Sequence, residues 1–166
     1  MKRIGLLSDT HSHMDERILF HLKEVDEIWH AGDIGDLSVT DALKAVAPLR
    51  AVYGNIDGAK IRAEFPLHDK FMAEGLRVWM THIGGRPGKY DHRIREAIFA
   101  ARPDIFVCGH SHICMVKADK SIGGIYMNPG AAGRHGFHHI RTLLRFNVDG
   151  RMVQDLEVIE LGKRAK

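Results

Sequence analysis

The chain has 166 residues, of which 45% are hydrophobic and 27% charged, and this composition excludes disordered and fibrous proteins. We expect one domain over residues 1–166, because this length suffices for a single hydrophobic core. The net charge of +3 suits an anionic substrate but is too small to indicate one. Cys108 and Cys114 cannot form a disulfide framework, and no apolar run reaches the ~18 residues needed to cross a membrane. A cytoplasmic protein without a membrane partner is therefore expected.

The first third of the chain alternates between apolar runs typical of buried strands and amphipathic runs typical of helices. The expected elements are a strand over 3–8, a helix over 15–25, a strand over 27–30, a helix over 37–46 and a strand over 49–53. This βαβαβ order predicts a parallel sheet with right-handed crossover connections.

The rest of the chain is richer in strands. We expect a hairpin of 67–74 and 76–82, a helix over 90–101, a buried strand over 104–109, and strands over 113–119, 123–128, 140–148 and 152–161. An α/β beginning followed by antiparallel strands predicts two packed sheets with flanking helices.

Polar side chains follow several of these predicted strands at the point where each strand ends. They are Asp9, His11, Asp33, Asn55, His82, His110 and His112. Ligands of open α/β sheets gather beyond the carboxyl ends of the strands, so we expect these seven side chains to converge. A mixture of imidazole, carboxylate and amide donors suits Mn, Fe, Zn or Ni better than Ca or Mg.

Seven donors are too many for one tetrahedral ion, but they suit two ions that share a carboxylate. A water between two such cations is strongly acidified, so hydroxide becomes available near neutral pH. Gly32, Gly54 and Gly109 each precede one of the donors, and glycine permits the close backbone approach that such a site needs.

The motifs around these residues occur in a recognisable order. "DTH" ends at His11, "GD" at Asp33, "GN" at Asn55, "TH" at His82 and "GHSH" at His112. In this order, and with "NPG" at 128–130, they resemble the calcineurin-like metallophosphoesterase superfamily, and in particular its small phosphodiesterase branch, which is related to the retromer subunit. The resemblance implies a four-layer αββα sandwich of two mixed sheets with flanking helices.

The resemblance also implies roles for the donors. Asp9, His11 and His112 would hold one divalent ion, Asn55, His82 and His110 the other, and Asp33 would bridge them. Manganese is the first expectation for the metal, with Fe, Zn and Ni as alternatives. Asp33, Asn55 and His110 would be catalytic, and Asn55 would contact the substrate phosphate as a bridging hydroxide attacks phosphorus.

Two departures from the family pattern concern the substrate. Ile56 stands where many larger members have a histidine that assists the leaving group, which leaves Asp57 and His30 as weak candidates for a general acid. The second histidine of the "THGH" motif is absent. Arg86 and Arg134, in loops near the site, are the candidates for further substrate contacts, with solvated loops as the alternative.

The sequence therefore predicts a metal-dependent hydrolase of phosphodiesters, with some monoesters as further substrates. One alternative is a non-catalytic scaffold of the same fold, which the complete donor set disfavours. A nuclease is the other, although no long basic stripe or aromatic platform for nucleic acid is present. The expected partner is a small phosphoester, and a homo-oligomer stays open.

Overall fold

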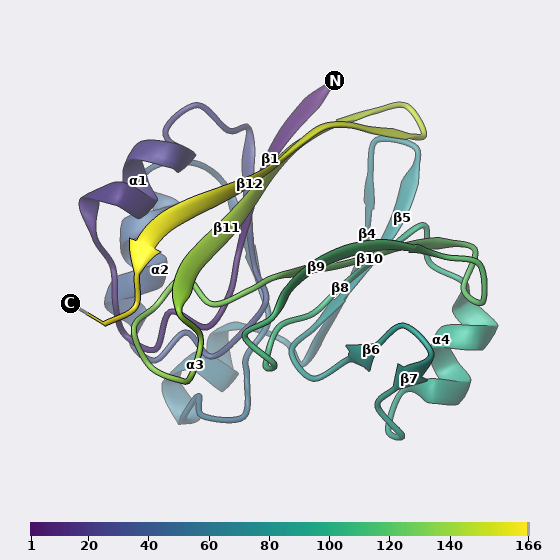
Figure 1. The fold of residues 1–166 in the computed structure, drawn as a ribbon, viewed down its shortest axis with the longest axis horizontal. Coiled ribbons are helices and arrows are strands. Elements are labelled where there is room, and N and C mark those ends of the chain that lie inside the picture. Colours follow the sequence, from purple (N-terminus) through teal and green to yellow (C-terminus); the bar gives the residue numbers. More distant parts are fainter. Residues whose placement is uncertain (166) are drawn as a thin grey trace.

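Two five-stranded sheets organise the chain in a computed structural model that describes residues 1–165 (Figure 1). The first sheet has the order β12-β11-β1-β2-β3. Its strands are β1 (Lys2–Leu7), β2 (Glu27–His30), β3 (Leu49–Ala51), β11 (Ile140–Asp149) and β12 (Met152–Lys163). The strands β1, β2 and β3 run parallel, as the βαβαβ pattern predicts, while β11 pairs antiparallel with both β1 and β12.

The second sheet has the order β4-β5-β8-β10-β9. Its strands are β4 (His68–Ala73), β5 (Leu76–Thr81), β8 (Ile105–Val107), β9 (Cys114–Asp119) and β10 (Gly124–Pro129). Here β5, β8 and β10 are parallel, and the predicted hairpin is the antiparallel pair β4–β5. A small separate hairpin joins β6 (Gly85–Arg86) to β7 (Lys89–Tyr90).

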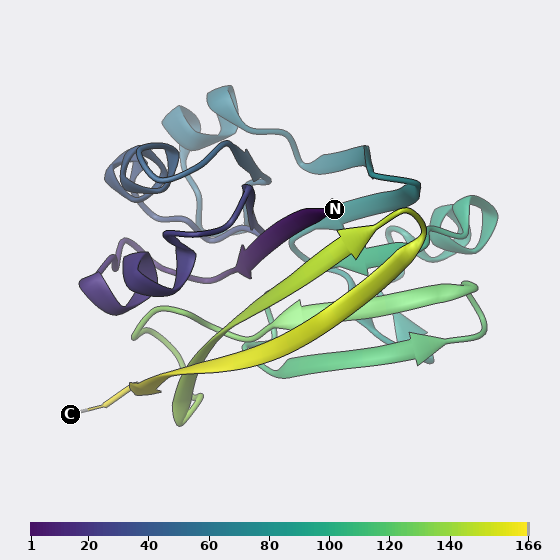
Figure 2. The same cartoon turned by 90° about the horizontal axis from the view of Figure 1, so that it is seen from above.

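Four short helices cover the outer faces of the two sheets. They are α1 (Glu16–Leu22), α2 (Leu37–Lys44), α3 (Ala59–Glu64) and α4 (Arg95–Ala101). Figure 2 shows α4 on the side opposite the other three helices. The sequence did not predict α3, and α4 is shorter than expected because residue 90 belongs to β7 and residues 92–94 form a turn before the helix. Within residues 1–165, no helix is long and apolar enough to cross a membrane.

Three apolar cores separate these layers. One lies between the first sheet and α1, α2 and α3, and a second lies between the two sheets. The third packs α4 against the second sheet. Strand β1 is apolar on both faces because Ile4 and Leu6 enter the core between the sheets while Leu7 enters the core beneath the helices. The predicted four-layer αββα sandwich is confirmed.

An ion pair between a buried arginine and a half-buried aspartate fixes α1 to the first sheet. Asp15 caps α1 by accepting a hydrogen bond from the Ile18 amide at 3.0 Å, and its other oxygen accepts one from Arg141 at 2.8 Å. Arg141 on β11 is fully buried and also donates to the Ala132 carbonyl. Partial burial would raise the pKa of Asp15, but the bonds from Ile18, His13 and Arg141 outweigh it and lower the pKa to about 2.

We expect Asp15→Asn to destabilise the protein at neutral pH, because asparagine still caps a helix but leaves the Arg141 charge unpaired. The loss should be about 1–2 kcal/mol once solvent screening at this partly exposed carboxylate is allowed for. Because the pKa of Asp15 is lower in the folded than in the unfolded protein, its carboxylate stabilises the fold at pH values above the unfolded-state pKa. The stability difference between wild type and variant should therefore shrink as pH falls from 5 towards 2. Urea unfolding across this range measures it. Asp36→Asn, which changes the cap of α2 without a buried arginine, is the matched control and should cost less than ~0.5 kcal/mol.

Candidate metal centre

The carboxyl ends of parallel strands from both sheets meet at one edge of the sandwich. Leu7 at the end of β1 pairs with His30 at the end of β2, and Met80 in β5 pairs with Val107 at the end of β8. The loops that leave these strands carry the seven predicted donors. The prediction that these side chains converge rests on this shared edge, and the structure brings them together.

The donor-bearing loops have an unusual backbone. Among residues 1–165, nine residues other than glycine have positive φ angles, and five of them are predicted metal ligands. These five are Asp9, His11, Asp33, His110 and His112, with φ between 45° and 70°. Aspartate and histidine are among the few non-glycine residues that tolerate this left-handed region, and such conformations cluster at functional sites.

The first group of donors is Asp9, His11 and His112, whose donor atoms lie within 4.8 Å of one another. Asp9 Oδ1 lies 3.2 Å from His112 Nε2 and 3.8 Å from His11 Nε2. Its other oxygen accepts hydrogen bonds from the Ser8 hydroxyl at 2.6 Å and from the His110 amide at 3.1 Å. One oxygen of Asp9 is therefore held by the protein while the other faces the histidines.

The second group is Asp33, His82 and His110, again within 4.8 Å. Asp33 Oδ2 lies 3.2 Å from His82 Nε2 and 3.5 Å from His11 Nε2, so this carboxylate faces both groups. The amide oxygen of Asn55 lies 3.0 Å from His110 Nδ1. Asp33 and His82 are buried whereas Asn55 and His110 are exposed, so the second group is open to solvent on one side.

The donor atoms at the middle of the site have no partner of their own. Asp9 Oδ1, His11 Nε2 and His82 Nε2 are buried and make no hydrogen bond with any described residue. An unsatisfied buried polar atom costs about 1–3 kcal/mol, so three that converge need a compensating ligand. Carboxylate and imidazole donors fit a divalent transition metal, and the residues present are suited to hold one.

Charge coupling inside the cluster opposes the effect of burial. Burial by itself would raise the pKa of Asp9, but His11 and His112 hold it well below its usual range. Burial would also raise the pKa of Asp33, but the His82 ring, whose Nε2 lies 3.2 Å from Asp33 Oδ2, lowers it. Burial would lower the pKa of His82, yet Asp33 and Asp9 raise it. The two carboxylates are therefore kept as anions.

Hydrogen bonds behind the donors fix their orientation. His82 Nδ1 lies 2.7 Å from the Ala31 carbonyl, to which it donates, and this leaves Nε2 with a lone pair that faces the carboxylates. His30 Nδ1 accepts from the Gly32 amide, so its Nε2 donates to Thr10, which lies between Asp9 and His11. Burial lowers the pKa of His30 to about 4. His30 is thus a neutral support of the first loop.

Asp57, the other candidate general acid, is also committed to the backbone. Its carboxylate accepts hydrogen bonds from the amides of Ile34, Gly35 and Gly54 at 2.8–3.1 Å. These amides belong to the loops that carry Asp33 and Asn55. Asp57 therefore clamps the two loops together, and nothing in its contacts directs it at a substrate.

The segment 131–139 covers one side of the centre. The ring of His135 stacks on that of His11 with centroids 4.6 Å apart, and His138 meets His112 edge to face at 5.1 Å. Arg134 donates a hydrogen bond to the Arg164 carbonyl, and its predicted contact with substrate stays a prediction. From the sequence, the glycine-rich loop that holds His135 and His138 is either a substrate gate or a plain strand connection, and neither histidine is predicted as a ligand.

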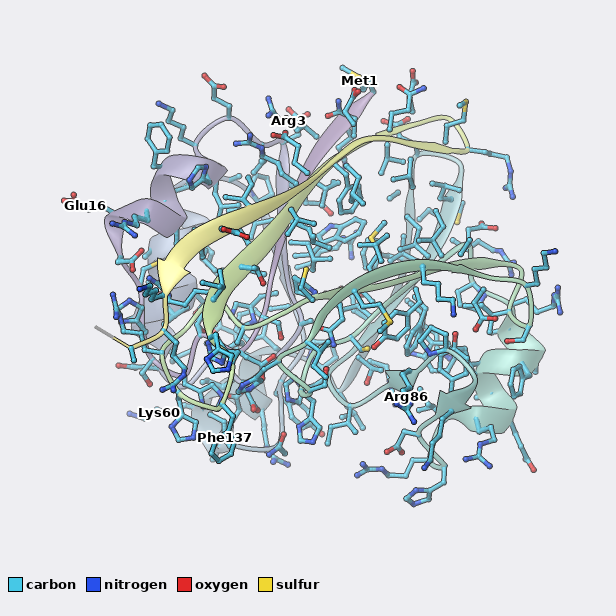
Figure 3. The ribbon with its side chains drawn as sticks, in the orientation of Figure 1. Met1, Arg3, Glu16, Lys60, Arg86 and Phe137 are labelled. Atoms are coloured by element: carbon cyan, nitrogen blue, oxygen red, sulfur yellow. The ribbon has the colours of Figure 1, made fainter. Side chains whose placement is uncertain are left out.

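A cavity of about 500 Å³ opens over the donors. Three exposed apolar side chains border it, with exposed fractions of 47% for Ile56, 61% for Ile113 and 96% for Phe137. Figure 3 shows Phe137 at the outer boundary of the molecule below the sheets, whereas Arg86 lies near α4. The predicted contact residue Arg86 is absent from this cavity and lines a neighbouring one.

Comparisons with known proteins agree with this geometry. A family model described as the calcineurin-like phosphoesterase superfamily domain matches residues 1–151. The chain is 28% identical over 164 residues to a protein of Methanothermobacter thermautotrophicus named "Probable metallophosphoesterase", covering 96% of this chain and 92% of that one. It is 26% identical over 144 residues to a phosphodiesterase of Methanocaldococcus jannaschii, covering 77% of this chain and 82% of the relative.

A solved structure supports the same fold. Vps29 of Entamoeba histolytica, in complex with zinc, superposes with a TM-score of 0.72 at 16% identity, covering 96% of this chain and 99% of that one. At this identity the likeness concerns the fold alone. The match of the family model over most of the sequence is the stronger finding, and by it this chain belongs to the calcineurin-like phosphoesterase superfamily.

Proposed function

We propose that this protein hydrolyses phosphodiesters at a centre of two divalent metal ions. The observation that carries the proposal is the convergence of three buried, unpartnered donor atoms, on Asp9, His11 and His82, from two loops far apart in the sequence. Membership of a phosphoesterase family and the phosphodiesterase name of a relative support the reaction class.

Each donor has a proposed role. Asp9, His11 and His112 would hold one ion, His82, His110 and Asn55 the other, and Asp33 would serve both because its Oδ2 faces a histidine of each group. When bound, the two ions would supply an acidified water and positive charge opposite the phosphate. Asn55 and His110 would meet the substrate, since they form the solvent-facing side.

The surroundings of Asn55 favour substrates with good leaving groups. Ile56 has no proton to donate, and Asp57 and His30 are both held by backbone or buried partners. A general acid contributes typically ~10²–10⁴-fold, so esters of acidic alcohols lose least when it is missing. Phosphodiesters with such a group are therefore proposed over simple alkyl monoesters.

Manganese is the proposed metal, with Fe, Zn and Ni as the other candidates. The donor set has carboxylate, imidazole and amide groups but no thiolate, which suits this series. The Vps29 structure with zinc has the same fold, and this supports a divalent metal without selecting one. We also propose the cytoplasm as the location, because Cys108 and Cys114 are free thiols and a reducing compartment keeps thiols free.

A scaffold of the same fold is the second candidate, because Vps29 shares the architecture. The full set of seven donors favours the enzyme, since a scaffold has no need of strained ligand loops. We keep the small phosphoester as the proposed partner, and neither self-association nor nucleic acid is required by the proposal.

Hydrolysis by metal-loaded protein tests the proposal. Protein purified without added metal should contain up to two divalent ions per chain by elemental analysis. We expect it to hydrolyse bis-p-nitrophenyl phosphate faster than the p-nitrophenyl monoester, to lose this activity with a chelator, and to regain it with Mn²⁺. Protein that binds no metal and is inert on both esters under all four metals would contradict the proposal.

A further inference from the structure

A second cavity of about 590 Å³ lies beside the candidate centre, and we call it the side cavity. Its walls are the β6–β7 hairpin, the segment that leads into α4, and residues 109–111. His110 lines both the side cavity and the cavity over the donors. A group attached to a phosphate at the centre can therefore extend past His110 into the side cavity.

The inner part of the side cavity is aromatic and apolar. Tyr90 and Tyr126, both almost fully buried, form its base, Met115 is partly buried beside them, and the exposed Ile113 stands at its border. The hydroxyl of Tyr90 donates to Asp119 and that of Tyr126 donates to the Gly85 carbonyl. Because both hydroxyls are used within the protein and both residues are only 2% exposed, the carbon surface open to a ligand is mainly that of Met115 and Ile113, which suits the face of a flat ring.

The outer part carries an excess of positive charge. Arg93 is neutralised by Asp91, which it contacts at 2.8 Å, and Arg95 donates to the Tyr90 carbonyl. Arg86 and Lys89 lie on the two strands of the hairpin, and neither has an ion-pair or hydrogen-bond partner for its side chain within residues 1–165. Figure 3 shows Arg86 at the hairpin, away from Lys60 and Phe137.

We infer that the side cavity binds one ester group of the substrate, and that this group is a nucleoside carrying a second phosphate. The ring would lie against Met115 and Ile113, above the buried Tyr90 and Tyr126, and the second phosphate would meet Arg86 and Lys89. This inference rests on the phosphodiesterase function proposed above. A volume of about 590 Å³ is within the range of small-molecule sites, ~300–1,000 Å³, and is large enough for a nucleoside.

Three diesters with the same leaving group test the assignment. They are methyl p-nitrophenyl phosphate, the p-nitrophenyl ester of thymidine 5′-phosphate, and the same thymidine ester with a 3′-phosphate. We expect KM to fall along this series. In the double variant Arg86→Gln/Lys89→Gln, KM for the 3′-phosphorylated ester should rise about tenfold, the size expected for lost charge-assisted contacts. KM for the methyl ester and kcat for all three should stay within about twofold.

The control is Lys60→Gln, which removes one exposed positive charge from α3 outside the side cavity and should change none of these values. Equal KM values for the three esters would overturn the inference. A preference for the 3′-phosphorylated ester that the double variant leaves intact would overturn it as well, since the second phosphate would then not meet Arg86 and Lys89.

Binding without turnover separates the inference from the proposed function. Calorimetry with thymidine 3′,5′-bisphosphate on chelator-treated protein should give an affinity about tenfold weaker in the double variant than in the wild type and in Lys60→Gln. If the wild type binds this probe more tightly than the double variant yet cleaves no ester, the proposed function is wrong and the assignment of the side cavity is supported. If it cleaves the methyl ester well but does not bind the probe, the assignment of the side cavity is wrong and the proposed function is retained.

Discussion

Asp33→Ala is expected to lower kcat/KM for bis-p-nitrophenyl phosphate by at least about a thousandfold, which corresponds to ~4 kcal/mol of transition-state stabilisation. Among residues 1–165, Asp33 is the carboxylate that lies within 3.5 Å of histidines from both donor groups. Its loss would remove a ligand of both proposed ions and leave His11 and His82 without their anionic neighbour. Metal content by elemental analysis should fall in parallel.

Asp41→Ala is the matched control, because it removes the same side chain from the exposed face of α2, eight residues further on. It should retain activity and metal content within about twofold, since exposed carboxylates contribute little. Circular dichroism would show that both variants fold. Full turnover and full metal content in Asp33→Ala would contradict the site described above.

Gly54→Ala is expected to reduce activity by about a hundredfold although the new methyl group carries no chemistry, because a displacement of ~1 Å at a reacting group has that effect. A Cβ at position 54 would collide with both the amide nitrogen and the carboxylate of Asp33. Backbone cannot give way as a flexible side chain does, so the loop that carries Asp33 must move. The measurement is kcat/KM with the same diester.

The matched control is Gly58→Ala in the same loop. A Cβ there meets nothing within 4 Å, and its φ of −90° suits any residue. This variant should keep kcat/KM within about twofold and lose only a few tenths of a kcal/mol as a helix cap. Equal activity in the two variants would show that the approach of Gly54 to Asp33 does not position the carboxylate.

The sequence predicted the fold class and the donors because both depend on local patterns. Alternating apolar runs identify the strands, and the polar residue after each strand is placed by the parallel topology. Gly32 and Gly54 also predicted a close backbone approach at the site. A side chain at position 32 would collide with His82, and one at position 54 would collide with Asp33. The assignment of each donor to a metal, and the single domain over residues 1–166, stay predictions.

Other features depend on contacts between distant residues and have no local signal. Asp57 looks like a candidate acid in the sequence, and only the fold brings three amides from two loops around it. Arg134 has the chemistry of a phosphate contact, but the C-terminal segment engages it. The stacking of His135 on His11 likewise requires that residues far apart in the chain meet.

The left-handed backbone at five of the donors has a consequence for how this protein would respond to selection. Each such residue costs the folded chain roughly 1–2 kcal/mol before any offset from its surroundings, and glycine would relieve that cost. A library of variants chosen only for resistance to heat should therefore accept glycine early at positions such as His11 and His112. The selected variants would be more stable to heat but would lack donor side chains of the candidate metal centre.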